Sequence, residues 1–138
     1  MWDSRKQGAS VTTKQRGDAA EDAALAHLQR HGLRLVQRNF RTPGRGGGEV
    51  DLIMREPDGT LVFVEVRQRA SASRGGAGAS ITAVKQRRIA FAARHFLLRL
   101  GSEAPCRFDV VLLQGAQDPA QTARIEWLRA AFDASGTF

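Results

Sequence analysis

Residues 48–67 read GEVDLIMREPDGTLVFVEVR, and this segment contains the clearest structural pattern of the chain. Two runs rich in valine, isoleucine and leucine, 49–55 and 61–67, have the length of ordinary strands. Between them, Pro57-Asp58-Gly59 supplies turn residues. The segment therefore predicts a β-hairpin.

Charged residues occupy matching places in the two predicted strands. Because side chains alternate between the faces of a strand, Glu49 shares a face with Asp51, and Glu65 shares a face with Arg67. Burying an unpaired carboxylate is costly, so two neighbouring strands that each bring an acid toward one region indicate a divalent-metal site. The alternative is that these are solvated strand ends, with Glu65 and Arg67 forming a surface ion pair worth less than about 1 kcal/mol.

The composition bounds the class of protein. A chain of 138 residues is one domain with a single core, and a net charge of +7 with a pI of about 11.1 favours a polyanionic partner such as nucleic acid. Of the 21 basic residues only Lys6, Lys14 and Lys85 are lysine, a bias that GC-rich coding would also produce. The single Cys106 excludes a disulfide or a cysteine-based zinc site within the chain.

No apolar run approaches the roughly 18 residues of a membrane span, and the N-terminus lacks the apolar centre of a signal peptide. We therefore expect a cytoplasmic protein without membrane contact.

The remaining sequence predicts one α/β domain, in which a mixed central β-sheet is flanked by helices. We expect a flexible basic tail at 1–15, the domain at 16–133 and a C-terminal tail at 134–138. Within the domain the pattern predicts helices at 17–31 and 82–100, strands at 33–39 and 107–113, a mobile basic loop at 68–80, and an edge strand at 125–128 closed by a helical turn through 130–132.

The first predicted helix carries an acid on its core-facing side. Glu21 lies four residues before Leu25 and seven before Leu28, so it shares a face with both leucines and needs a partner. The second helix buries a stripe that we predict to consist of Ile89, Ala92, Ala93, Phe96, Leu97 and Leu100. Lys85 lies one turn before this stripe.

Other chemistry-bearing residues have simpler interpretations. His27 and His31 are spaced like helical metal ligands, but a solvated helix flank is the stronger interpretation. Asp109 beside Arg107 indicates a structural ion pair. The aromatic residues near the C-terminus, including Trp127, indicate core or edge packing.

Several blocks of the sequence closely resemble the YraN-type family of small bacterial proteins. The resemblance covers roughly residues 16–133, and its blocks are Gly17–Glu21, Gly48–Ile53, Leu61–Arg67, Lys85–Ile89 and Arg107–Val111. That family looks like a branch of the restriction-endonuclease-like, or PD-(D/E)XK, superfamily, related in fold to archaeal Holliday-junction resolvases. The resemblance implies a restriction-endonuclease-like fold and a metal-dependent endonuclease that acts on structured DNA.

The resemblance also implies roles for individual residues. Glu21 matches the helix acid, Asp51 the first strand acid and Glu65 the second acid, and these three would bind Mg²⁺ or Mn²⁺. Arg67 stands where the superfamily usually has lysine. Arginine keeps its charge and can only orient or neutralise, so Lys85 is the alternative source of a base.

A resolvase-like enzyme would also need to hold its substrate. Nucleic-acid contacts are expected from Arg45, Arg69, Arg74, Arg87 and Arg88, and resolvases imply a homodimer by analogy. Because the lysine is absent at position 67, a non-catalytic nucleic-acid-binding protein with the same fold is the alternative. A structural partner of a ribosomal or replication complex is a third class.

Overall fold

The structure is a computed structural model that describes residues 13–44, 46–69, 81–101, 103–114 and 124–133. Some of the predicted features lie outside the described residues. These are the C-terminal tail, most of the N-terminal tail, the segment 70–80, and the side chains of Arg45 and Arg74.

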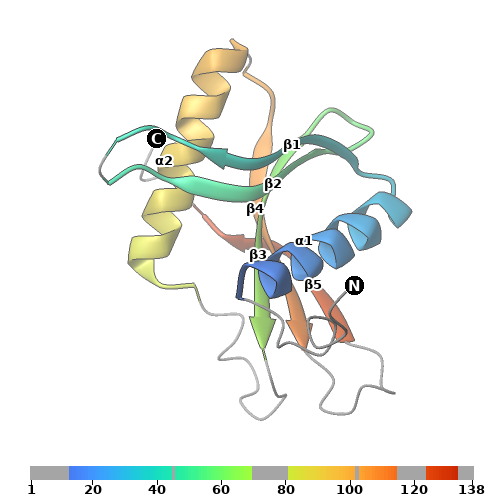
Figure 1. Cartoon of the computed structure of the whole chain (residues 1–138). Helices are drawn as coiled ribbons and strands as arrows, with labels where there is room; N and C mark the ends of the chain where they lie inside the picture. The colour runs from blue at the N-terminus through green and yellow to red at the C-terminus, as the bar shows by residue number, and fades with distance from the viewer. Residues whose placement is uncertain (1–12, 45, 70–80, 102, 115–123, 134–138) are drawn as a thin grey trace, which may run out of the picture.

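Within the described residues, two helices and five strands form a single α/β domain with a mixed sheet, which confirms the predicted fold class (Figure 1). The sheet order is β1-β2-β3-β4-β5, with every neighbouring pair antiparallel except the parallel pair β3 and β4. A parallel pair needs a long crossover, which α2 provides. The elements are α1 (Thr13–Arg30), β1 (Arg34–Arg41), β2 (Glu49–Arg55), β3 (Leu61–Arg69), α2 (Ala83–Leu100), β4 (Cys106–Gln114) and β5 (Arg124–Phe132).

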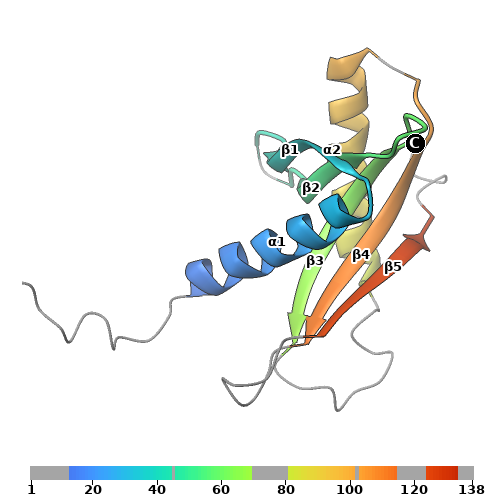
Figure 2. The same cartoon turned by 90° about the vertical axis from the view of Figure 1, so that its right-hand side faces the viewer.

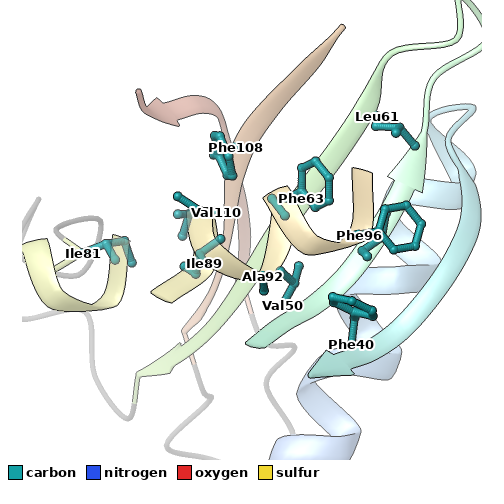
Figure 3. Packing of buried hydrophobic residues seen from close by; sticks show 13 residues of the cluster. Phe40, Val50, Leu61, Phe63, Ile81, Ile89, Ala92, Phe96, Phe108 and Val110 are labelled. Atoms are coloured by element: carbon teal, nitrogen blue, oxygen red, sulfur yellow. The ribbon is translucent and has the colours of Figure 1, made fainter. Parts of the chain in front are cut away.

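The two helices cover opposite faces of the sheet (Figure 2). Under α2, Phe63 lies at the centre of a cluster in which Phe96 and Phe108 contact its ring (Figure 3). On the other face of the sheet, Ala24 and Leu28 of α1 pack against the strands. The predicted helix stripes are confirmed except at Leu100, Leu97 and Leu25, of which the first is exposed and the other two are only partly buried.

The last strand corrects the predicted C-terminal helical turn. β5 continues through Phe132, and residues 130–132 belong to the strand. Asp109 is the physical reason, because its fully buried carboxylate accepts hydrogen bonds from Trp127 Nε1 and from the backbone N of Ala130, both at 2.9 Å. These bonds hold an irregular stretch of β5, in which Ala130 has a φ of 49°, against β4.

Several element boundaries also differ from the prediction, and β1 ends at Arg41 instead of residue 39. The helix α1 begins at Thr13, inside the predicted tail. β3 continues to Arg69 because its parallel register with β4 extends to the pair Arg69↔Gln114, so positions 68 and 69 belong to a strand and not to a loop.

The hairpin of β2 and β3 opens into a fork. The register between them runs from Arg55↔Leu61 to Leu52↔Val64, whereas β3 stays paired with β4 along its whole length. The pair β1–β2 turns away from β3, β4 and β5 (Figure 1). The acids of the two predicted strands therefore lie where the sheet divides.

Candidate functional site

Asp51 occupies the point at which β2 leaves β3. Its Oδ2 accepts a hydrogen bond of 2.8 Å from the backbone N of Val66, a donor that lies beyond the last β2–β3 register pair. The carboxyl group of Asp51 also shares a hydrogen bond with that of Glu65. The fork thus brings together the two strand acids that the hairpin predicted.

Burial raises the pKa of both carboxyl groups, and the charge of Asp51 adds to the effect at Glu65. Glu65 is 7% exposed, and its burial, followed by the charge of Asp51, raises its pKa to about 8. Burial also raises the pKa of Asp51, although the hydrogen bond from Val66 opposes the shift. Two carboxylates this close do not both ionise readily, so Glu65 holds the shared proton at neutral pH.

Lys85 reaches the same carboxyl pair from α2. Its Nζ lies 3.5 Å from Glu65 Oε2 and 3.8 Å from Glu49 Oε1. The other oxygen of Glu49 lies 3.3 Å from Arg41 Nε. Thr82 caps the helix by accepting a hydrogen bond from the backbone N of Lys85 at 3.1 Å, which sets the start of α2 at this place.

Gly48 brings β2 against α2. A Cβ atom at this position would lie 1.9 Å from the carbonyl oxygen of Arg88, so only glycine fits. The backbone N of Gly48 also donates to Thr42 Oγ1 at 2.6 Å. This close approach is what lets Glu49, the next residue, reach Lys85. A glycine directly before a predicted strand could have indicated a close backbone contact at this position. The sequence does not show that the contacting element is α2.

Glu21 lies on the α1 side of the fork. Burial and then the charge of Asp51 raise the pKa of Glu21, so the two acids are electrostatic neighbours. The partner that its position required is Arg38, whose Nε lies 3.4 Å from Glu21 Oε1 and whose Nη2 lies 2.6 Å from Asp22 Oδ1. Within the described residues no group of three or more His, Cys, Asp or Glu side chains is arranged to hold a metal, so the role of Glu21 as a third ligand stays a prediction.

An open pocket of about 360 Å³ adjoins the carboxyl pair. It combines one acid with two cationic side chains, a hydroxyl and an amide, a lining that suits a phosphate group bound beside a carboxylate-held cation. Its lining residues are Glu65, Val66, Arg67, Gln68, Thr82 and Lys85.

Of the arginines predicted to contact nucleic acid, Arg87 and Arg88 are exposed on α2. Arg69 is the last residue of β3. The predicted solvated helix flank is confirmed at His31, which is exposed, while His27 is half-buried; the rings of His31 and His27 also lie 5.6 Å and 6.3 Å from that of Trp127 on β5. No pattern in the sequence indicates that contact, because it joins α1 to the far edge strand.

Comparison with known proteins gives a consistent family match. A family model described as "Uncharacterised protein family UPF0102" matches residues 20–113. A UPF0102 protein of Polaromonas naphthalenivorans is 63% identical over 98% of this chain and 100% of its own length. Another, from Albidiferax ferrireducens, is 68% identical over 89% of this chain and 91% of its own length.

The helices also bear on the membrane prediction. Neither α1 nor α2, the helices of the described part of the chain, is long and apolar enough to span a membrane.

Proposed function

The chain belongs to the uncharacterised protein family UPF0102, and we propose that it is a metal-dependent nuclease of the restriction-endonuclease-like superfamily that hydrolyses phosphodiester bonds in structured DNA. One observation carries the proposal. The carboxyl groups of Asp51 and Glu65 lie together at the fork of the sheet, largely buried, with Lys85 beside them and an open pocket of about 360 Å³ next to them. Perturbed acids that converge at an open pocket are typical of functional sites.

The carboxyl pair suits a divalent cation of the magnesium type. Mg²⁺ is commonly held by one or two carboxylates, while water and substrate oxygens complete its shell, so a pair of acids is sufficient. A bound cation would also favour the ionised form of Glu65, which burial and then the charge of Asp51 disfavour. Asp51 and Glu65 would hold the ion, which would stabilise negative charge on a phosphate oxygen and lower the pKa of a water molecule.

Two basic residues would divide the work that the superfamily assigns to one lysine. Arg67 lines the pocket and keeps its charge, so its role would be to bind and orient the phosphate. Lys85 also lines the pocket and contacts Glu65, and its ammonium group can exchange protons. In this arrangement Lys85 would be the acid–base group that transfers a proton during hydrolysis, and Arg67 would neutralise negative charge on the phosphate.

The partner we propose is DNA, held by the positive charge of the chain. The net charge of +7 and the exposed Arg87 and Arg88 support binding to phosphates. By analogy with resolvases the proposal includes a homodimer, which light scattering at several protein concentrations would test.

A cleavage assay tests the proposed function. Purified protein is incubated with branched, duplex and single-stranded DNA in Mg²⁺, Mn²⁺ or EDTA, and we expect cleavage only with a divalent metal. The Asp51→Asn protein, purified identically, controls for a contaminating nuclease. Equal cleavage by the two proteins would contradict the assignment of the site. Binding without cleavage in either metal would favour the alternative, a non-catalytic nucleic-acid-binding protein, whose motivation is the arginine at position 67.

Two further variants test which basic side chain, Lys85 or Arg67, takes part in proton transfer. We expect Lys85→Met to lower the cleavage rate about 100-fold, because a positioned acid–base group typically contributes that much. Arg67→Lys should retain the rate within about threefold, because charge is its role. Single-turnover rates at saturating DNA separate these effects from binding. If Lys85→Met left the cleavage rate unchanged and Arg67→Lys changed it strongly, the role that the superfamily gives to lysine would belong to the residue at position 67.

A further inference from the structure

We infer that the outward face of α2, centred on Phe91, is a binding site for an unpaired base, so that the preferred substrate carries a single-stranded arm next to the bond that is cut. The inference rests on the proposed function, because it names the substrate class of the same site. It concerns a surface on which the sequence alone indicated only Arg87 and Arg88.

Three apolar side chains form a row along this face. Val84, Phe91 and Leu98 are 53%, 41% and 70% exposed. Their spacing of seven residues places them almost on one line of a helix that turns through about 100° per residue. The buried side chains of α2, such as Ile89 and Ala93, lie on the opposite side. The row therefore faces away from the core.

The centre of the row is aromatic and surrounded by basic side chains. The exposed ring of Phe91 lies 4.5 Å from the ring of the half-buried His95, so two aromatic rings meet at this surface. By helical geometry, Arg87 and Arg94 flank the row on one side and Arg88 flanks it on the other, and all three are exposed. Residues 83–100 contain no acid. An aromatic surface between cations suits single-stranded nucleic acid, in which bases stack on rings while arginines hold the phosphates.

The exposed ring of Phe91 is within reach of the site. Phe91 follows Lys85 by six residues, which corresponds to about 9 Å along the helix axis and about 120° around it. Consecutive phosphates of one DNA strand rise by about 3.4 Å each. A strand whose phosphate occupies the pocket beside Lys85 could therefore place a base on Phe91 a few nucleotides away.

Binding measurements without divalent metal test this inference separately from cleavage. The unaltered protein in EDTA is titrated against a fluorescent duplex and the same duplex with a single-stranded arm. Phe91→Leu keeps an apolar side chain but removes the ring, whereas Phe91→Trp keeps a stacking surface. Leu98→Ala is the control for a second, more exposed apolar residue of the same row. Circular dichroism verifies the fold of each variant.

We expect Phe91→Leu to weaken binding of the armed duplex about tenfold, within the range measured for loss of base stacking. Binding of the blunt duplex should change less than about twofold, and Phe91→Trp should restore binding of the arm. The inference is overturned if Phe91→Leu leaves armed-duplex binding unchanged, or if Leu98→Ala weakens it equally, which would show that binding depends on apolar surface in general and not on stacking against the Phe91 ring. A protein that never cleaves but shows the Phe91 effect would refute the proposed nuclease and leave this base-binding site standing.

Discussion

Glu65→Gln is expected to lower metal-dependent cleavage about a thousandfold and, at the same time, to stabilise the folded protein above pH 8. The first effect follows because glutamine lacks the charge that would hold a divalent cation, and a thousandfold loss corresponds to about 4 kcal/mol of transition-state stabilisation. The second follows from the site itself. Glu65 is buried beside Asp51, so its ionised form is disfavoured in the folded protein.

The sign of the pH effect follows from proton binding. The pKa of Glu65 rises from its ordinary value of 4.5 to about 8 on folding, so between these values the folded state binds more protons than the unfolded state. The stability of the wild-type protein therefore falls as pH rises from about 5 to above 8. The glutamine variant lacks this loss, and its advantage should be on the order of 4 kcal/mol at pH 8.5 and small near pH 5.

Urea unfolding at several pH values measures this difference, and the cleavage assay is run on the same preparations. The exposed Glu126→Gln is the matched control and should change neither quantity. If Glu65→Gln were destabilising at every pH, Glu65 would be ionised and satisfied in the folded state. Retained cleavage by the variant would remove Glu65 from the proposed metal site.

Gly48→Ala is expected to destabilise the protein by about 3 kcal/mol, a large effect for one methyl group. The added Cβ would lie 1.9 Å from the carbonyl oxygen of Arg88 and 3.0 Å from the backbone N of Ala92. Both obstacles are main-chain atoms of α2, which cannot move aside as a flexible side chain would. Either β2 or α2 must shift, and the contact of Glu49 with Lys85 would be lost with it.

Chemical denaturation measures this stability change, and Gly17→Ala is the matched control. Gly17 lies in α1, and a methyl group added there would meet no atom within 4 Å, so alanine should stabilise the protein by about 0.5–1 kcal/mol. Equal effects of the two substitutions would show that strand β2 and helix α2 do not approach each other at Gly48.

Local patterns in the sequence were sufficient for the elements that carry the strand acids. Strand alternation and the Pro57-Asp58-Gly59 turn predicted the hairpin of β2 and β3, and the structure confirms it. The same alternation predicted that Asp51 and Glu65 would approach each other, because neighbours in a hairpin are close in sequence. The need of Glu21 for a partner was also visible in the helical periodicity, but its partner, Arg38, was not.

The tertiary structure decided everything that depends on distant segments. It placed Lys85 against Glu65 and Glu49, brought Gly48 against α2, and extended β5 through the buried Asp109. These contacts arise from how helices pack on the sheet and where strands separate, and no short-range pattern encodes them. The sequence by itself therefore determined which acids lie at the fork, whereas packing determined which lysine they meet. The physical reason is that strand pairing in a hairpin is local, while the position of α2 depends on the whole core beneath it.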